Sequence, residues 1–246
     1  MHKIFIEPGK IWNSLGSDKK ICIDGDRAHH LLHVLRVKPG DVLTVCDGAN
    51  NDYSCVVVDV SRGCAVIWLQ INESSLCNNE PQTRVTLYQA LPKGDKMDLI
   101  IQKNVELGIH AITPVVTDHT EPKFIKRDRI TRYRRISEAA AAQSMRGIIP
   151  VVNEVLSFGE AIIESSGYNC FMAAYENERN ITIAKRLDES PNPKNIGIMI
   201  GPEGGFSDRE ALLFAPYTVT LSKRILRTET AGFAALMQIF IHLGDM

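Results

Sequence analysis

A glycine-rich loop follows an apolar run toward the end of the chain. The run Ile196 to Ile200 leads directly into Gly201-Pro202-Glu203-Gly204-Gly205. In open α/β sheets, ligands bind at the carboxyl ends of the strands, and glycines there let a ligand approach the backbone. Ser207 and Glu210 follow at the spacing of a capping box, which predicts a helix start. The loop lacks the lysine of a phosphate-binding P-loop, so its spacing fits either another ligand loop or a plain tight turn.

Charged residues gather at a second junction, residues 221–231, with the sequence LSKRILRTETA. A strand-like run at 218–221 ends there, and a helix that is apolar nearly all round is expected at about 230–243. Ionic groups beside such an apolar segment usually have partners or a task. Arg227 and Glu229 are therefore candidate site residues, with structural capping of the helix as the alternative.

Lysines mark a third junction, Leu91-Pro92-Lys93-Gly94-Asp95-Lys96, where a strand-like run ends and a helix is expected at 96–107. Positive charge at a helix start opposes the helix dipole unless an anion is bound, so the loop fits either a phosphate backbone or simple solubility. A basic run at 123–135 contains seven Lys or Arg residues and one Asp. It is sufficient to attract phosphate, although a solvated helix face is the simpler interpretation.

Two patterns of secondary structure surround these junctions. Short runs rich in Val, Ile and Cys lie at 3–6, 20–23, 41–46, 53–60 and 64–71, with a helical segment at 26–36. Many short strands at close spacing predict a small barrel. After a polar segment at 73–82, strand-like runs at 84–90, 111–116, 170–174, 196–200 and 218–221 alternate with helical segments, which predicts an α/β fold with a mainly parallel sheet. The expected domains are residues 1–73 and 74–246.

Composition places the chain among ordinary globular proteins. It has 246 residues, 44% of them hydrophobic and 23% charged, and a net charge of -1, so no global attraction to nucleic acid is expected. No apolar run approaches the length of a membrane span and the N-terminus lacks a signal-peptide core, so a cytoplasmic protein is expected. The six cysteines form no Cys-x-x-Cys pair and are expected to be reduced and mostly buried. Neither they nor His29, His30 and His33 predict a metal site.

Five segments in order resemble the bacterial 16S ribosomal RNA uridine-N3 methyltransferases of the RsmE type, within the SPOUT superfamily. They are HHLLHVLRVKPGD (29–41), LPKGDKMDLIIQKNVELGI (91–109), AAQSMRGIIP (141–150), IGPEGGFSDRE (200–210) and RILRTETA (224–231), and they span nearly the whole chain. The resemblance implies an N-terminal PUA-like β-barrel that binds RNA and a C-terminal SPOUT domain with a parallel sheet and a deep trefoil knot. It also implies a homodimer, S-adenosylmethionine as the cofactor, no metal, and 16S rRNA within the 30S subunit as the substrate.

The resemblance assigns roles to individual positions. It implies a cofactor site formed by Ala174, Tyr175, Glu176, Ile200, Gly201, Glu203, Gly204, Gly205, Leu221, Ser222, Ile225 and Leu226. Arg227, Thr228 and Glu229 match the segment beside the reacting centre. RNA contacts are implied for Arg36, Lys93, Asp95, Lys96 and Arg146. Three positions depart from the family pattern: Ser222-Lys223 replaces a glycine that is often followed by proline, His119 replaces a frequent arginine, and His2-Lys3 lacks a common arginine.

Methylation of uracil N3 makes three demands on such a site. N3 loses a proton, negative charge develops on the uracil oxygens, and nitrogen, methyl and sulfur must be aligned. We expect Arg227 to stabilise the uracil anion, and Glu229 or Glu203 to accept the proton or orient the base, with water as an alternative acceptor. The alternative functions are another SPOUT activity such as ribose 2′-O or tRNA methylation, a non-catalytic ribosome-binding factor, and an unrelated phosphate-binding enzyme.

Overall fold

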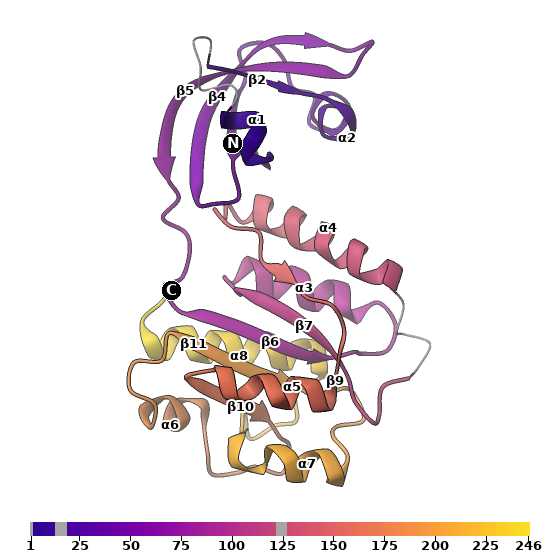
Figure 1. Ribbon diagram of the computed structural model, residues 1–246, viewed down its shortest axis with the longest axis vertical. Helices are drawn as coiled ribbons and strands as arrows, with labels where there is room; N and C mark the ends of the chain where they lie inside the picture. Colours follow the sequence, from indigo (N-terminus) through magenta and orange to yellow (C-terminus); the bar gives the residue numbers. More distant parts are fainter. Residues whose placement is uncertain (1, 13–18, 122–126) are drawn as a thin grey trace. The chain divides into compact units, whose positions relative to one another are not determined.

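The computed structural model describes residues 2–12, 19–121 and 127–246 (Figure 1). The chain forms two compact units, one of residues 1–80 with 141–149 and the other of residues 81–140 with 150–246. The sequence placed the boundary after residue 73, but that position lies inside a strand that continues to Leu76. The return of residues 141–149 to the first unit was not expected, because nothing in their local spacing indicates which sheet they contact.

The first unit is built on a five-stranded sheet. Its elements are β1 (His2–Phe5), α1 (Pro8–Trp12), β2 (Lys20–Ile23), α2 (Gly25–His29), the π-helix η1 (His30–Val34), β3 (Val42–Cys46), β4 (Asn51–Ser61) and β5 (Val66–Leu76). The strand order is β1-β3-β4-β5-β2, in which only the β1–β3 pairing is parallel. In the described part of the chain β1 and β2 do not pair, so backbone hydrogen bonds do not close the expected barrel completely.

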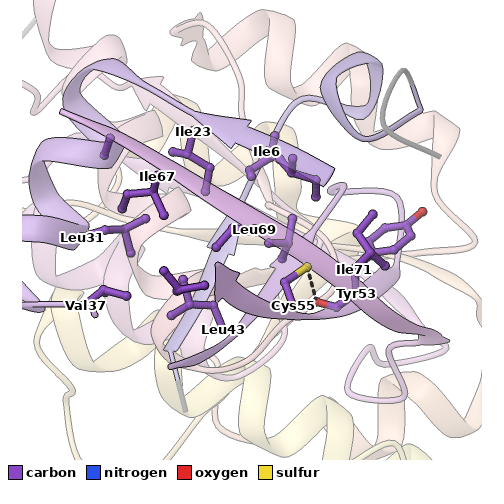
Figure 2. Packing of buried hydrophobic residues seen from close by; sticks show 14 of the residues in the cluster. Ile6, Ile23, Leu31, Val37, Leu43, Tyr53, Cys55, Ile67, Leu69 and Ile71 are labelled. Carbon is purple, nitrogen blue, oxygen red and sulfur yellow. Dashed lines mark hydrogen bonds between the residues drawn. The ribbon is translucent and has the colours of Figure 1, made fainter. Parts of the chain in front are cut away.

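Branched aliphatic side chains fill the centre of this unit (Figure 2). Leu43 points inward from β3, Ile67 and Leu69 point inward from β5, and Leu31 enters the same cluster from η1. The alternation of buried and exposed positions along β4 and β5 places every second side chain in the core, as a pleated strand requires. The helix expected at 26–36 is present as α2 and η1, and its second half is π-helical.

The second unit is built on a seven-stranded sheet. Its elements are β6 (Arg84–Ala90), α3 (Lys96–Glu106), β7 (Ala111–Val116), α4 (Arg127–Gln143), β8 (Val151–Val152), β9 (Leu156–Ser157), α5 (Phe158–Glu164), η3 (Ser165–Gly167), β10 (Cys170–Ala174), α6 (Ile183–Asp188), β11 (Asn195–Ile200), α7 (Asp208–Phe214), η4 (Ala215–Tyr217), β12 (Thr218–Val219) and α8 (Thr228–Leu243). The order is β12-β10-β11-β6-β7-β8, with β9 also on β7, and every pairing is parallel. The predicted α/β fold is confirmed; the trefoil knot stays a prediction.

Neighbouring residues of β6 show what covers each face of this sheet. Tyr88 belongs to an aromatic cluster with Phe158 of α5 and Phe214 of α7. Leu87 and Gln89, which point to the opposite face, lie beneath Gly232 of α8. On that face α8 packs against α3 and α6 as well as β6 and β11. The sheet thus separates an aromatic layer from an aliphatic layer in which the amide side chains of Gln89 and Asn104 are buried.

The last helix is only partly covered by its own chain. Ala235, Leu236, Ile239 and Phe240 are buried, whereas Phe233 and Ile241 are 40% and 63% exposed. The helix ends at Gly244, which has a φ of 67° and provides a left-handed cap. α8 is thus apolar on its outer side as well, as predicted. Among the described residues, no helix is both long enough and apolar enough to cross a membrane.

Candidate active site

Three loops at the carboxyl ends of β10, β11 and β12 line one cavity of about 470 Å³. Because these strands are parallel, their carboxyl ends lie at the same edge of the sheet. Every residue predicted to hold the cofactor lines this cavity: Ala174, Tyr175, Glu176, Ile200, Gly201, Glu203, Gly204, Gly205, Leu221, Ser222, Ile225 and Leu226. The fold therefore brings together segments that are up to fifty residues apart, although their roles stay predictions.

The loop after β11 has a backbone that demands glycine at one position. Gly205 has a φ of +68°, and a Cβ there would lie 2.6 Å from Oε1 of Glu176. The Gly205 carbonyl also lies 3.0 Å from Nδ1 of His119, so this histidine contacts the glycine-rich loop. Ser207 then begins α7 with the predicted capping box, which is confirmed by its reciprocal bonds with Glu210. The turn and the cap together hold the loop at the cavity wall.

The loop after β12 contains Ser222, at the position where the resemblance implies a glycine. Ser222 is not among the residues with positive φ, so no glycine-specific conformation is needed. Its Oγ accepts a hydrogen bond of 3.2 Å from the backbone N–H of Arg224. The preceding carbonyl, of Leu221, accepts a bond from Gln238 of α8 at 3.1 Å. The loop is therefore held from both sides without the glycine.

The start of α8 forms the fourth part of the cavity wall. Arg227 is exposed, lies at the N-cap position and lines the cavity. Thr228 is buried and donates from Oγ1 to the carbonyl of Gly201 at 2.7 Å. Glu229 is not among the lining residues, and one of its carboxylate oxygens lies 3.4 Å from Nζ of Lys96. Of the three residues predicted beside the reacting centre, two reach the cavity and the third reaches it through a lysine.

Lys96, predicted to contact RNA, also lines the cofactor cavity. Its Nζ lies 2.8 Å from Oε1 of Glu203, so one lysine is shared by Glu203 and Glu229. The hydrogen bond to Glu203 raises the pKa of Lys96. Burial acts to raise the pKa of Glu203, but the hydrogen bonds from Lys96 and the backbone lower it overall. Glu203 is therefore a weaker base than an ordinary carboxylate, which favours Glu229 or water as the proton acceptor.

The other residues predicted to bind RNA have different surroundings. Arg36 is exposed and has a left-handed backbone with a φ of 56°. Lys93 is 61% exposed in its side chain and pairs with Glu121 at 3.0 Å. Asp95 is exposed at the start of α3 and makes no side-chain cap. Arg36 and Lys93 are available to a phosphate backbone, although Lys93 must first exchange its carboxylate partner. The Asp95 carboxylate would repel phosphate, so an RNA contact at this position would be to a hydrogen-bond donor. Residues 123–126 of the predicted basic run lie outside the described residues.

Arg146, which was predicted to contact RNA, is buried. Its side chain is only 4% exposed, and Nε donates to Oε1 of Glu80 at 3.2 Å. The same Glu80 oxygen accepts the backbone N–H groups of Gly147 and Ile148 at 2.9 and 3.2 Å. A buried guanidinium held in this way does not reach phosphate. We therefore correct the role of Arg146 from RNA contact to a structural ion pair.

Several cavity residues were not predicted from the sequence. They are Arg179, Pro202, Phe206, Thr220, Arg224 and Ala231, together with Lys96 and Thr228, for which other roles were expected. Each lies within a few residues of a predicted position, so extending every motif to the end of its loop would have found most of them. Arg179 is among them, because it lies three residues after Glu176 in the loop between β10 and α6.

Comparison with known proteins gives matches over both units. A family described as RNA methyltransferase domain matches residues 78–239, and one described as RNA methyltransferase PUA domain matches residues 23–66. Ribosomal RNA small subunit methyltransferase E of Bacillus subtilis is 33% identical, over 97% of this chain and 96% of that protein.

Solved structures agree with this result. A crystal structure of ribosomal RNA small subunit methyltransferase E from Neisseria gonorrhoeae bound to S-adenosyl methionine has a TM-score of 0.86 and 28% identity, covering 98% of this chain and 97% of the other. A methyltransferase of Legionella pneumophila in complex with the same cofactor has a TM-score of 0.84 and 25% identity, over 98% and 97% of the two chains.

Proposed function

The chain belongs to the ribosomal RNA small subunit methyltransferase E family, and from this premise we propose that it transfers a methyl group from S-adenosylmethionine to N3 of one uridine in 16S rRNA. One observation carries the proposal. All the predicted cofactor residues, which come from three separate loops, line a single cavity at the carboxyl edge of the parallel sheet. Ligand sites of α/β sheets lie at this edge.

The residues of this cavity fit a nucleoside cofactor. Its volume of about 470 Å³ lies within the range of small-molecule pockets, roughly 300–1,000 Å³. Gly205 leaves open the space that a Cβ would fill beside Glu176. The backbone of Leu221 to Leu226 would hold the adenine, and the loop from Gly201 to Gly205 would shape the rest of the pocket. S-adenosylmethionine supplies an activated methyl group on a sulfonium, so the chain's own residues need to orient and deprotonate the base.

Arg227 and Glu229 divide the remaining chemistry. The guanidinium of Arg227, exposed at the cavity, stabilises negative charge on the uracil oxygens as N3 loses its proton. Glu229, whose side chain is 16% exposed, accepts that proton directly or through water. Glu203 orients the base or the lysine rather than taking the proton, because its pKa is lowered. Lys96 keeps both carboxylates in place while the base enters.

The partners follow from exposed features of each unit. Arg36 in the first unit and Lys93 and Lys96 in the second would contact the RNA backbone, within a 30S subunit in the cytoplasm. Phe233 and Ile241 leave an apolar strip along α8, which supports a homodimer with that helix in the interface. N3 lies on the Watson–Crick edge, so the target uridine must be unpaired or turned out of its stack.

The test is transfer of labelled methyl groups to a defined nucleotide. Purified protein is incubated with labelled S-adenosylmethionine and 30S subunits from a strain that lacks this activity, and the product is mapped by nuclease digestion and mass spectrometry. A single 3-methyluridine in 16S rRNA is the expected result. A methylated ribose or a methylated tRNA would establish another SPOUT activity instead. Absence of cofactor binding by calorimetry would leave a ribosome-binding factor as the function.

A further inference from the structure

The strand β6 ends in a buried amide that the reaction has not used. Gln89 is fully buried on the face of the sheet that α8 covers. Its Nε2 donates to the carbonyl of Ala90 at 3.0 Å and to Oγ1 of Thr228 at 2.9 Å. Both partners are acceptors at these contacts, which assigns the amide nitrogen, rather than the oxygen, to this side.

Thr228 extends this contact to the cofactor loop. Its single hydroxyl hydrogen is donated to the carbonyl of Gly201 at 2.7 Å, so the hydroxyl can only accept from Gln89. The two bonds therefore run in one direction, from β6 through the first residue of α8 to the end of β11. Thr228 is also the residue between Arg227 and Glu229, the two groups assigned to the reaction. One buried hydroxyl thus joins the catalytic segment to the cofactor loop.

The Gln89 amide is buried although its oxygen has no hydrogen-bond partner among the described residues. Among the described residues, Oε1 of Gln89 and Oδ1 of neighbouring Asn104 have no hydrogen-bond partner. A Cβ at Gly232 would lie 3.5 Å from Gln89 Oε1 and 3.3 Å from Leu87, so α8 sits close above the amide. An aliphatic side chain would fill this space without leaving a buried acceptor unpaired. An amide at position 89 is therefore less favourable for packing than an aliphatic side chain, but it can direct the Thr228 hydroxyl.

We propose that Gln89 and Thr228 are positioning residues of the methyl transfer, an inference that rests on the proposed function. Their two hydrogen bonds keep the first turn of α8, with Arg227 and Glu229, in a constant position relative to the Gly201 loop. Alignment of nitrogen, methyl and sulfur then depends on this link, because displacement of about 1 Å is enough to slow a transfer about 100-fold. Gln89 does not line the cavity, and the proposed role of both residues is to hold the first turn of α8 rather than to act on the substrate.

Variants that remove one donor at a time test the link. Thr228→Val loses the hydroxyl at nearly constant shape, Thr228→Ser keeps it, and Gln89→Met removes the amide without changing α8. Asn104→Leu is the matched control, because the Asn104 side chain is also fully buried and donates to the carbonyl of Ile100 in its own helix, at 2.8 Å, rather than to the start of α8. For each variant, kcat and the KM for 30S subunits are measured at saturating S-adenosylmethionine, with cofactor Kd by calorimetry and Tm by scanning calorimetry.

We expect Thr228→Val and Gln89→Met each to lower kcat about tenfold and to weaken cofactor binding, with KM for 30S changed less than about twofold. Thr228→Ser restores kcat to within about twofold. The double variant Thr228→Val/Gln89→Met is no slower than Thr228→Val, because both remove the same link. Asn104→Leu keeps kcat whatever its Tm.

Two results would overturn the inference. One is unchanged kcat and cofactor Kd in both Thr228→Val and Gln89→Met, with only Tm lowered; the other is an equal loss of kcat in Asn104→Leu. If Thr228→Val does not fold, Gln89→Met decides by the same criteria. A wild-type protein that binds no S-adenosylmethionine and methylates no RNA is a different failure, since it overturns the proposed function and this inference with it.

Discussion

Two groups of basic residues in this protein have opposite surroundings. In the first unit, Lys3 and Arg146 have side chains that are 0% and 4% exposed, and each is bound to a carboxylate of that unit. In the second unit, Lys93 and Lys96 are 61% and 35% exposed, and their carboxylate partners, Glu121 and Glu203, are also partly open to solvent. The first group is enclosed by its partners, whereas the second can exchange them.

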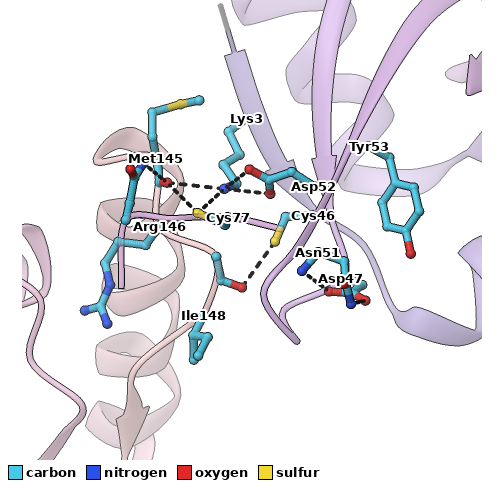
Figure 3. Close-up of polar contacts among 12 residues, drawn as sticks. Lys3, Cys46, Asp47, Asn51, Asp52, Tyr53, Cys77, Met145, Arg146 and Ile148 are labelled. Carbon is cyan, nitrogen blue, oxygen red and sulfur yellow. Dashed lines mark hydrogen bonds and ion pairs between the residues drawn. The ribbon is translucent and has the colours of Figure 1, made fainter. Parts of the chain in front are cut away.

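The enclosed group is held in structural ion pairs, whereas the exposed group is accessible to the RNA contacts proposed for it. Lys3 donates to Asp52 at 2.8 Å and to the carbonyl of Met145 at 3.2 Å, which attaches residues 141–149 to β1 and β4 (Figure 3). Withdrawing such a cation leaves a buried charge without a partner. Lys96, by contrast, is solvated enough for phosphate to replace a carboxylate. A basic residue in an RNA-binding protein is therefore informative only once its exposure is known.

Substitution in the buried ion pair of Arg146 with Glu80 should cause the largest loss of stability. Arg146→Ala leaves Glu80 buried without its cation, so we expect the free energy of unfolding to fall by about 3–5 kcal/mol. Urea denaturation measures this change. Arg134→Ala, at an exposed pair with Glu154, should cost less than about 1 kcal/mol. If Arg146→Ala kept wild-type stability but lost RNA binding, the assignment of Arg146 to the fold would be wrong.

Arg227 is expected to give the largest effect on activity. Arg227→Ala removes the cation beside the developing uracil anion, so kcat should fall about 100- to 1,000-fold at saturating RNA, with little change in Tm. Single-turnover methyl transfer to 30S subunits measures it. Arg209→Ala, an exposed arginine of α7 that does not line the cavity, is the control. Full turnover by the Arg227 variant would show that Arg227 does not stabilise the uracil anion.

Gly205 should give an intermediate effect through the backbone. Alanine in its left-handed conformation costs about 1–2 kcal/mol, and the new Cβ would displace the end of the Glu176 side chain. Gly205→Ala is therefore expected to weaken cofactor binding about tenfold in calorimetry. Gly159→Ala, in α5, has open space and an ordinary φ, so it should leave the Kd unchanged. Equal Kd values for both variants would show that the loop adapts freely.

The pH profile should give the smallest effect, and it distinguishes the two lysines. The lowered pKa of Glu203 means that its ion pair is intact above the usual carboxyl value of 4.5 and is lost as pH falls below it. Lys96→Met removes the largest contribution that lowers this pKa, so the acid limb of kcat/KM should move to higher pH. Lys93→Met should not move it, because only the backbone N–H of Lys93 contacts Glu203. If the pH profiles of Lys96→Met and the wild type coincided, the ionisation of Glu203 would not control kcat/KM.

Much of the fold could be predicted from local spacing. The bounds of β2, β6, β7 and β10 agree with the expected runs, and α3 begins at the predicted residue. Strands with alternating or continuous apolar runs are recognisable because each residue's burial repeats with the period of the strand. The two-residue strands β8 and β9 and the π-helix η1 were missed, since such short elements depend on what they pack against.

The sequence by itself determined most of the longer elements and the loops that end them, and the family resemblance assigned many of the loop residues that line the cavity. A glycine's φ preference, a capping box and an apolar period act over a few residues, so they can be recognised before the fold is known. Only the tertiary structure decided which charges are paired and which buried polar groups reach the site. Glu80 and Arg146 are 66 residues apart in sequence, and Gln89 and Thr228 are 139 apart. Contacts at such separations exist only after the sheets have assembled, because the chain must close long loops to make them.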